Sequence, residues 1–417
     1  MKALQKFTNA GIPKDWTPLR LKTVCNFNYG IPLSDSNRVD GPYPVYGSNG
    51  IVGWHNSYFV TGPGIVVGRK GTAGEVSWVF DNFTPIDTTF YITLKDQTNN
   101  MKYVYYLLQI CGFEKFSGAT GVPGLNRNDA YKLIIPMPKE TEQKAIAEIL
   151  SKVDQAIEVV KKSIKVADKL KKSLMQNILT GKLKPDGSWR SEEEFYVDEK
   201  FGKIPKGWHI VKGNKITSKI TKGQSPKWKG FEYQPSGILF VTSENVRDGY
   251  IDVSEPKFLP VEFHEKIKNS QLQNGDVLIN IVGASIGRCA VYDLNIELAN
   301  TNQAVCVLRI NDDNDSKFIS YYLQSEKTQR RLLGSQVETA RANLSLSDFR
   351  KFKFIIPETK HEQLLIAEEI EKVNSLIVSK QTKIHSLRIL KKSLMQNLLT
   401  GKVRVNVEEI NQLLEEV

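Results

Sequence analysis

Few residues in this sequence have the types and spacing that catalysis requires. The glycine-rich stretch Gly62 to Gly71, GPGIVVGRKG, does not have the spacing with which a P-loop surrounds phosphates. Enzymes that methylate adenine amino groups need a glycine-rich cofactor loop and a Pro-Pro-aromatic segment, and both are absent. Pro185 and Asp186 lack the correctly spaced Glu-x-Lys partner of a nuclease. We therefore predict that this chain has no catalytic residues.

The cysteines and histidines do not form a metal-binding pattern either. The four cysteines lie far apart without CxxC spacing, and the five histidines complete no zinc signature. We expect buried free thiols and no bound metal. The cysteines are Cys25, Cys111, Cys289 and Cys306.

Several loops of the first half combine glycines with basic or polar side chains that could contact base edges or phosphates. Arg69 and Lys70, in the segment GRKG, are the strongest candidates, because the glycines allow a close backbone approach and arginine can pair with guanine through two hydrogen bonds. A solvent-exposed hairpin tip remains the alternative for GRKG. The candidates of this half are Ser48, Asn49, Arg69, Lys70 and Arg127.

The second half offers a similar set of loop residues. The segment TKGQSPKWKG is a basic loop around Trp228, which could contact a groove or could instead anchor the core. Further candidates come from the segments TSENVRDG, GASIGR and TARANLS. The full set is Lys222, Gln224, Ser225, Lys227, Lys229, Ser243, Asn245, Arg247, Ser285, Arg288, Arg341 and Asn343.

The composition is that of a folded protein with an affinity for polyanions. Its 417 residues suggest two or three domains, and the contents of 40% hydrophobic and 25% charged residues are ordinary for globular proteins. The formal net charge of +11 favours a polyanionic partner. No signal peptide or run of about 18 apolar residues occurs. We expect a cytoplasmic protein that does not enter membranes.

An internal repeat organises the chain. The segment LKKSLMQNILTGKLK at Leu170 to Lys184 recurs as LKKSLMQNLLTGKVR at Leu390 to Arg404, with twelve of fifteen positions identical. The same offset aligns residues from Glu142 with residues from Glu362, and IPKDW at the front of the first half is echoed by IPKGW in the second. A repeat of this length indicates a duplicated domain.

The halves share a plan although their middle parts differ in sequence. Each has an apolar β-rich run broken by a glycine turn, then another strand, a short helix and a strand ending in IIP. We predict two mixed α/β (α+β) domains joined by two long helices, with an internal pseudo-two-fold repeat. The expected boundaries are domain 1 at 1–140, helix 1 at 141–182, a linker at 183–203, domain 2 at 204–359, helix 2 at 360–402 and a tail at 403–417.

The long helices are expected to form an antiparallel coiled coil. About 34 residues at 1.5 Å each span roughly 50 Å, which is longer than a domain of this size is wide. Helix 2 must leave the second domain, so paired helices run in opposite directions. Packing of each helix on its own domain alone remains the alternative, and Lys380 interrupts the apolar stripe. The expected interface residues are Ile146, Val153, Val160, Leu174, Ile366, Val373, Leu387 and Leu394.

Taken together, these features resemble the specificity subunits of type I restriction-modification systems over essentially the whole chain. The resemblance rests on the duplicated layout, the paired LKKSLMQN segments, the paired IPKDW and IPKGW starts, and the YGSNG and NGDVLI stretches. Leu170 to Lys182 and Leu390 to Lys402 match the conserved helical regions of that family. The family does not fix base-contacting residues, so none is carried over.

The resemblance implies a non-catalytic DNA-binding subunit. Each of its two target recognition domains would read one half of a split site in double-stranded DNA. The helices would set the spacer and bind two methyltransferase (modification) subunits, and restriction subunits would join in the full complex. S-adenosylmethionine, ATP and Mg are then expected on the partner subunits only, so this chain would carry no cofactor.

Other classes of function remain open from the residues alone. A stand-alone DNA-binding regulator would need no methyltransferase partner. An enzyme of unfamiliar type, such as a nuclease, and an RNA-binding scaffold are further alternatives, although no RNP-like or KH-like segment supports the last of these.

Overall fold

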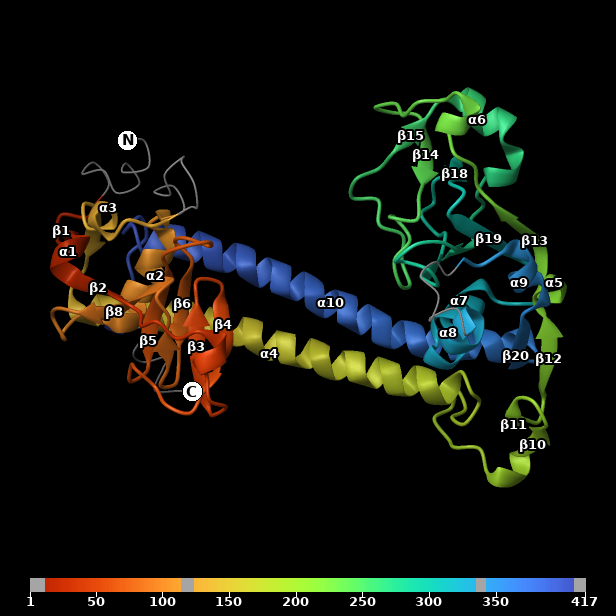
Figure 1. Cartoon of the computed structure of the whole chain (residues 1–417), viewed down its shortest axis with the longest axis horizontal. Coiled ribbons are helices and arrows are strands. Elements are labelled where there is room, and N and C mark those ends of the chain that lie inside the picture. The colour runs from red at the N-terminus through yellow and green to blue at the C-terminus, as the bar shows by residue number, and fades with distance from the viewer. Residues whose placement is uncertain (1–11, 114–123, 335–342, 409–417) are drawn as a thin grey trace. The chain divides into compact units, whose positions relative to one another are not determined.

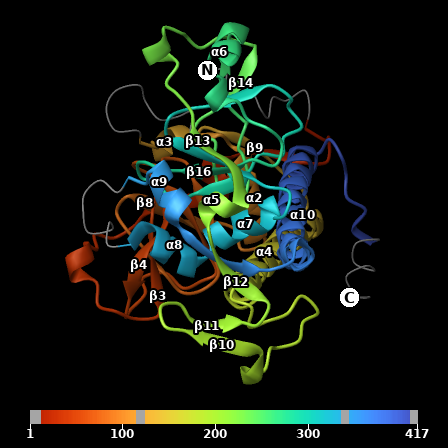
Figure 2. The ribbon, with the colours of Figure 1, turned by 90° about the vertical axis from the view of Figure 1, so that its right-hand side faces the viewer.

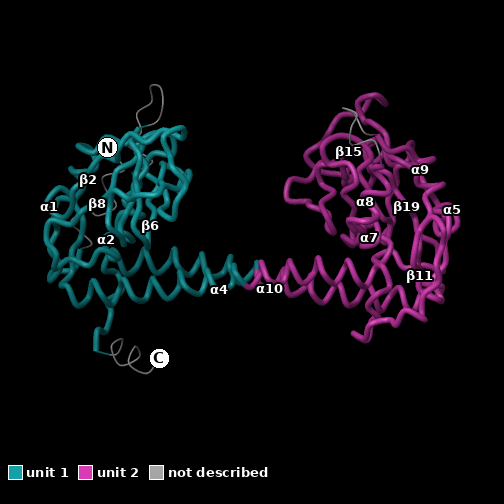
Figure 3. The backbone as a smooth tube through the Cα atoms, turned by 60° about the horizontal axis from the view of Figure 1, so that its bottom comes forward, with its two compact units in different colours: residues 1–162, 381–417 teal, residues 163–380 magenta. Residues whose placement is uncertain are grey.

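The computed structural model describes residues 12–113, 124–334 and 343–408, and the chain divides into two compact units (Figure 3). Unit 1 contains residues 1–162 and 381–417, whereas unit 2 contains residues 163–380. Each unit includes part of two long helices, α4 (Glu140–Ile178) and α10 (Lys360–Leu398), which pack together (Figure 1). No described helix is both long enough and apolar enough to span a membrane.

The β-strands of unit 1 form small sheets. One sheet has the order β2 (Cys25–Tyr29), β8 (Thr89–Leu94), β5 (Gly64–Gly68) and β6 (Val76–Val79), with antiparallel pairing throughout. A second has the order β4 (Gly50–His55), β3 (Tyr43–Gly47) and β7 (Thr84–Pro85), in which β3 and β7 are parallel. β1 (Thr17–Arg20) pairs with β9 (Ile134–Met137).

Short helices complete unit 1 and cover its core. They are α1 (Leu21–Val24), the 3-10 turn η2 (Asp35–Asn37), α2 (Met101–Ile110) and α3 (Arg127–Ala130). The β5 segment GIVVG is buried at every position because β5 lies between β8 and β6. The side chain of Asn100 caps α2 by accepting the N–H of Tyr103 at 2.9 Å, which satisfies a free donor of the first turn.

Unit 2 has sheets of the same kind. One has the order β13 (Thr217–Lys222), β19 (Val305–Ile310), β16 (Val277–Asn280) and β17 (Cys289–Val291), and another has β15 (Phe258–Leu259), β14 (Ile238–Val241) and β18 (Ala299–Thr301). β12 (Trp208–Lys212) pairs with β20 (Lys353–Pro357), and β10 (Phe195–Asp198) pairs with β11 (Gly202–Pro205).

The helices of unit 2 are α5 (Gly213–Ile216), α6 (Val261–Lys266), α7 (Ser316–Gln324), α8 (Glu326–Leu333) and α9 (Leu346–Lys351). Its 3-10 turns are η4 (Glu192–Glu194), η5 (Lys227–Lys229) and η6 (Lys268–Ser270). Figures 1 and 2 both place α6 at one end of the unit and the β10–β11 hairpin at the other.

The strand topology repeats the duplication that the sequence predicts. The order β2-β8-β5-β6 in unit 1 corresponds to β13-β19-β16-β17 in unit 2, and β4-β3-β7 corresponds to β15-β14-β18. In the three-stranded sheet of each unit, the last strand of this order, β7 or β18, is parallel to its neighbour β3 or β14. In each unit one helix, α2 or α7, contacts the outer strand β6 or β17. The two halves therefore share one scaffold although their sequences differ.

The long helices run in opposite directions, as expected. In unit 1, Ile146 and Leu150 near the start of α4 share a core with Met395 and Leu398 near the end of α10. In unit 2 the relation is reversed, because Ile178 at the end of α4 shares a core with residues at the start of α10. Lys391 of α10 also pairs with Asp154 of α4 at 2.7 Å.

The expected helix-pair residues are all at least partly covered. Ile146, Val160 and Ile366 are buried, and the other members are half-buried, namely Val153, Leu174, Val373, Leu387 and Leu394. Lys380, which interrupts the apolar stripe, is half-buried too. The assignment of these residues to a helix-pair interface stays a prediction.

In each unit, a tryptophan, a glutamate and an arginine tie the β-rich domain to the helices. In clasp 1, the Trp16 Nε1–H donates to Glu142 at 3.0 Å, and Arg404 donates to the same carboxylate at 2.8 and 2.9 Å. Clasp 2 consists of Trp208, Glu362 and Arg190: the Trp208 Nε1–H and Arg190 Nη2 donate to Glu362 Oε1 at 3.0 and 2.7 Å.

The clasps explain why the repeat keeps IPKDW, IPKGW and the paired glutamates. Each joins the start of a domain, the start of the helix that leaves it and the chain just beyond the end of the other helix. The arginines do not align in the repeat, since Arg404 corresponds to Lys184. Each unit thus reaches the same arrangement with an arginine from a different position.

We expect Glu142→Ala to lower the free energy of unfolding of unit 1 by about 2 kcal/mol. The carboxylate is nearly buried, and its loss leaves the Trp16 N–H without its acceptor and leaves Arg404 paired with Asp15 alone, at 2.7 Å. The effect falls below that of a fully buried pair because the Arg404 side chain is 43% exposed. Urea unfolding measures the change, and Glu140→Ala, which removes only the exposed pair with Lys144, is the control. Equal losses for both variants would contradict the role of the clasp.

Candidate nucleic-acid interface

Several strands of unit 1 end at one edge, which we call loop edge 1. β2 ends at Tyr29 opposite Phe90 in β8, and β5 ends at Gly68 opposite Thr89. β3 and β7 are parallel and reach the same edge. Leu125 joins it because its N–H donates to Arg69 O at 2.8 Å. Loop edge 1 comprises residues 29–31, 47–50, 68–72, 86–89 and 124–127, so it gathers all five candidates of the first half.

Two of these candidates flank one aromatic ring. The Cζ atoms of Arg69 and Arg127 lie 5.2 and 4.7 Å from the ring centroid of Tyr29, which is 49% exposed. The attraction between a guanidinium and an aromatic face holds both cations there. We call these three residues the Tyr29–arginine cluster.

The backbone fixes the guanidinium groups further. Arg69 Nε and Nη2 donate to Asp87 O at 3.0 and 2.6 Å, and Arg127 Nη1 donates to Phe27 O at 3.4 Å. Within the described residues, Arg69 Nη1 has no protein acceptor. Two like charges on one ring repel each other, and an anion or an electron-rich base edge would relieve that repulsion. The cluster is therefore suited to contact a phosphate or a base.

Glycine makes the close approach of these loops possible. A Cβ on Gly68 would lie 2.2 Å from Thr72 O and 3.1 Å from Ser48 O, so a larger residue would push the loops apart. Ser48 Oγ donates to Thr88 O at 2.5 Å, while Asn49 at the β3–β4 turn and Lys70 are exposed. Sequence reasoning missed Tyr29, whose only signal was its place at the end of an alternating strand before a glycine.

Unit 2 has a corresponding edge, loop edge 2. β13 ends at Lys222 opposite Cys306, β16 ends at Asn280 opposite Val305, and the parallel strands β14 and β18 end together. It comprises residues 222–231, 242–252, 280–288, 301–304 and 343–346. The described candidates of the second half all lie within these segments, and Arg341 lies outside the described residues.

A buried asparagine joins two candidate loops of loop edge 2. Asn280 Nδ2 donates to Ser243 O at 2.8 Å and to Ser285 Oγ at 3.0 Å. Because the Ser285 hydroxyl accepts from Asn280, its own hydrogen is left for another acceptor. Asn280 occupies the same place in its sheet as Gly68 does in unit 1. The sequence did not single out Asn280.

Other candidates are partly engaged within the domain. The Asn245 carboxamide accepts from Thr242 N and Oγ1 at 2.8 and 2.9 Å and donates to Asp252 O at 2.8 Å, so it holds its own turn. Arg247 pairs with Asp252 at 3.6 Å, and Gln224 donates to Asn269 at 3.3 Å.

The side chains of the remaining candidates form fewer hydrogen bonds and ion pairs within the domain. Ser225 and Arg288 are half-buried, and Asn343 pairs with Val282 through its backbone. Lys222, Lys227 and Lys229 are exposed. Trp228 is 80% exposed, so the alternative that it anchors the core is wrong.

The thiols are inert groups in this fold. All four cysteines are free and buried, as expected from the sequence. Burial raises the pKa of the Cys25 and Cys289 thiols to about 12. Among the described residues, no cluster of His, Cys, Asp or Glu could hold a metal ion.

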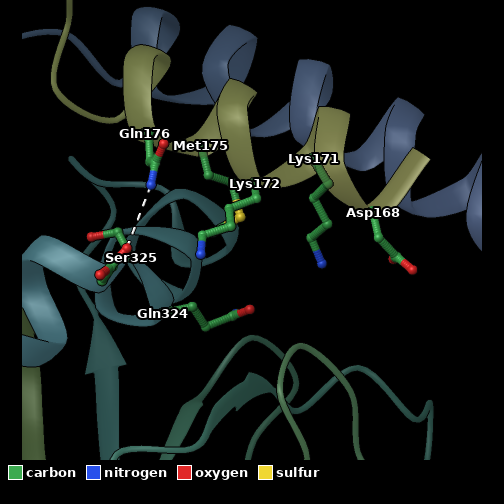
Figure 4. A pocket seen from close by; sticks show the side chains of 8 residues that line it. Asp168, Lys171, Lys172, Met175, Gln176, Gln324 and Ser325 are labelled. Carbon is green, nitrogen blue, oxygen red and sulfur yellow. Dashed lines mark hydrogen bonds between the residues drawn. The ribbon is translucent and has the colours of Figure 1, made fainter. Parts of the chain in front are cut away.

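A hollow of about 310 Å³ lies in unit 2 between α4 and the junction of α7 with α8 (Figure 4). Lys171, Lys172 and Met175 line it from α4, and Gln176 Nε2 donates across it to Glu326 at 3.4 Å. A second hollow, of about 610 Å³, extends it along α8. Burial, followed by the positive charges of Arg331 and Lys182, lowers the pKa of Lys327 beside it. This surface is formed by the end of α4, which carries the repeated segment, and by the α7–α8 junction with α8, not by the loops of loop edge 2.

A family model described as the type I restriction modification DNA specificity domain matches residues 13–168 and 205–388. The chain belongs to this family. It is a DNA specificity subunit of a type I restriction-modification system, as the sequence predicts, and specificity subunits are non-catalytic and carry no cofactor themselves. Membership also decides against a stand-alone regulator or an unfamiliar nuclease.

Known specificity subunits resemble this one along most of their length. It is 25% identical over 414 residues to the type I restriction enzyme MjaVIII specificity subunit of Methanocaldococcus jannaschii, with 94% of each chain covered. It is 23% identical over 420 residues to the EcoBI specificity subunit of Escherichia coli, covering 94% of this chain and 86% of that one.

Solved structures confirm the fold class. The crystal structure of the type I restriction-modification S subunit from M. genitalium matches with a TM-score of 0.58 and 17% identity, covering 94% of this chain and 97% of that one. A chain from work on complex assembly and conformational transition of the type I system matches with a TM-score of 0.53 and 16% identity, covering 94% and 99%.

Proposed function

We propose that each unit reads one half of a bipartite site in duplex DNA through its loop edge. Helices α4 and α10 set the spacing between the halves and bind two methyltransferase subunits, and restriction subunits join in the full complex. We also propose that this assembly works in the cytoplasm, where the host DNA lies.

The observation that supports this proposal most strongly is the repeated topology of the two loop edges. The same strand ends gather in both units, yet they carry different side chains. Loop edge 1 presents the Tyr29–arginine cluster, whereas loop edge 2 presents lysines, serines and an exposed tryptophan. A constant scaffold with different polar loops suits two readers of different base sequences.

The repeated helical segments support the proposed partner. Leu170 and Leu390 are equivalent in the repeat, and they are 53% and 47% exposed. Each leucine is followed by two lysines, and in unit 2 the hollows beside Met175 and Leu179 extend this surface. Matching surfaces of this kind suit two copies of one partner. One structurally similar chain comes from work on complex assembly, which agrees with this assignment.

We expect Arg69→Ala to weaken binding by about 1–3 kcal/mol at a single base pair of one half-site. The Tyr29 ring and Asp87 O hold this guanidinium in one orientation, which suits direct pairing with a base. Affinities of the chain with its methyltransferase partners for single-base variants of the site measure the effect. Arg20→Ala, which removes an exposed arginine of β1 outside loop edge 1, is the matched control.

The pattern of loss separates three outcomes. A uniform loss over all base variants, with a salt slope reduced by about one, would assign Arg69 to a phosphate instead. If Arg69→Ala had the same affinity as Arg20→Ala, GRKG would be a solvent-exposed hairpin tip that does not contact DNA. A loss confined to one base pair supports direct readout.

A further inference from the structure

A short loop of unit 2 is anchored on both sides of an exposed tryptophan. On one side, Pro226 is buried. On the other, the Phe231 ring packs on Phe263, with centroids 5.4 Å apart, against a small core cluster. Between these anchors, η5 (Lys227–Lys229) makes one turn and ends at Gly230, whose φ of 79° suits glycine.

The loop is held in place without help from the tryptophan. The N–H groups of Gly230 and Phe231 donate to Lys227 O and Pro226 O at 3.2 and 3.1 Å. A Cβ on Gly223 would lie 1.8 Å from Thr301 O, so the loop enters in close contact with the strand ends. Trp228 is nevertheless 80% exposed. This large apolar side chain is held in solvent by a fixed loop and lacks the burial that usually stabilises tryptophan. Binding of a partner that covers the ring would therefore be favourable.

The surroundings of Trp228 favour an anionic partner. Lys227 and Lys229 flank it, and neither forms an ion pair within residues 12–113, 124–334 and 343–408. The loop also follows β13 at loop edge 2. The loops that follow β16 and β14 place Ser285 and Ser243 at the same edge. These lysines are best matched by a partner that carries negative charge on both sides of an apolar or aromatic surface. Duplex DNA has this arrangement, because phosphates border its bases and sugars.

We propose that Trp228 is the apolar anchor of loop edge 2 on duplex DNA, with Lys227 and Lys229 at flanking phosphates. This assignment rests on the proposed reading function of unit 2. The indole buries its face against bases or sugars in the groove, and the two lysines fix the position of the loop along the backbone. Tryptophan at the centre of an interface commonly contributes a large share of the affinity.

The first test measures whether DNA covers the indole. The full chain, assembled with its methyltransferase subunits, is titrated with a duplex that carries its site, and tryptophan emission is recorded. We expect most of the DNA-induced change to disappear in Trp228→Phe and to persist in Trp189→Phe. Trp189 is a suitable control because it is 63% exposed and lies between α4 and β10, outside loop edge 2.

The second test measures affinity and its salt dependence with a labelled duplex. We expect Trp228→Ala to weaken binding roughly tenfold with an unchanged salt slope, and Trp228→Phe to retain most of the affinity. The double variant Lys227→Ala and Lys229→Ala should instead reduce the salt slope by about two, since each lysine contacts one phosphate. These different signatures separate the apolar contact from the charged ones.

Three results would overturn the assignment. If Trp228→Ala bound the duplex as tightly as the unaltered complex, and if Trp228→Phe kept the DNA-induced emission change as fully as Trp189→Phe, DNA would not cover the ring. Loss of methyltransferase binding with normal DNA affinity would assign Trp228 to a protein interface. If the unaltered complex bound no duplex at all, the proposed function itself would fail, and this inference with it.

Discussion

Replacing residues 17–133 with the same segment of a related specificity subunit should change one half of the recognised DNA sequence and leave the other half unchanged. The segment carries all of loop edge 1 but excludes Trp16, Glu142 and Arg404, so clasp 1 stays intact. Because unit 2 has its own loop edge and core, it should keep reading its half-site. Methylome sequencing of cells that carry the complete system reads both halves at once.

The structure shows where such an exchange needs care. β1 lies inside the exchanged segment, whereas its partner β9 lies outside it, so the donor must preserve the pairing of Thr17 with Met137. The donor must also supply apolar residues that pack on Ile146, Leu150 and Leu398, which remain from the host. A donor chosen for these matches separates a loss of folding from a change of specificity.

An equivalent exchange in unit 2 is the matched control. Residues 209–352 follow Trp208 and precede β20 in the same way as residues 17–133 follow Trp16 and precede β9. This second exchange should alter only the other half of the site. If either exchange changed both halves, the two units would not read independently, and the proposed division of the site would be wrong.

Lengthening both long helices by one heptad should lengthen the unread spacer of the DNA site. We would insert seven residues after Val160 and seven after Lys380, the equivalent positions of the repeat. These positions fall within three residues of the borders between the two units, away from the clasps and the domain cores. Seven residues turn the helix face by only about 20°, so the packing of α4 on α10 should survive.

The size of the effect follows from helix and DNA geometry. The insertion adds about 10 Å to each helix, and DNA rises about 3.4 Å per base pair, so the spacer could grow by up to roughly three base pairs. Three base pairs also rotate the second half-site by nearly a third of a helical turn. The DNA must then twist or the domains must move, and either change costs binding free energy. We therefore expect a longer preferred spacer together with weaker binding.

Selection of binding sites from a pool with spacers of every length measures the change. An insertion of five residues in each helix is the control, because it turns the apolar face by about 140° and should disrupt the pairing instead of extending it. A preferred spacer that stays the same in a folded heptad variant would show that the helices are not the ruler.

The sequence determined much of the architecture, because the relevant signals are local or repeated. The matching segments around Leu170 and Leu390 indicated the duplication, and the helical periodicity that starts at Ile146 and Ile366 predicted the long helices. Chain connectivity then required that the helices, if paired, run antiparallel, and the shared core of Ile146 with Leu398 confirms this direction. The resemblance to the family rested partly on the same features, and the non-catalytic role followed from that resemblance and from the missing catalytic motifs.

Candidate DNA contacts were harder to rank, because residue type does not show which donors and acceptors the fold already uses. Asn245 has the side chain of a base reader, but its carboxamide holds the turn between Thr242 and Asp252. Trp228 could have been a core residue by composition, and its exposure follows from Pro226 and Phe231 anchoring the loop instead.

By itself, the sequence determined the family, the duplication, the two long helices and the loops that carry polar side chains. Tertiary structure alone decided which of these side chains meet. Tyr29, Arg69 and Arg127 converge only because β2, β5 and the loop before α3 end at one sheet edge. Trp16, Glu142 and Arg404 converge because α10 returns to the first domain. Such contacts join residues dozens to hundreds of positions apart, and strand pairing and helix packing, not local propensity, place them together.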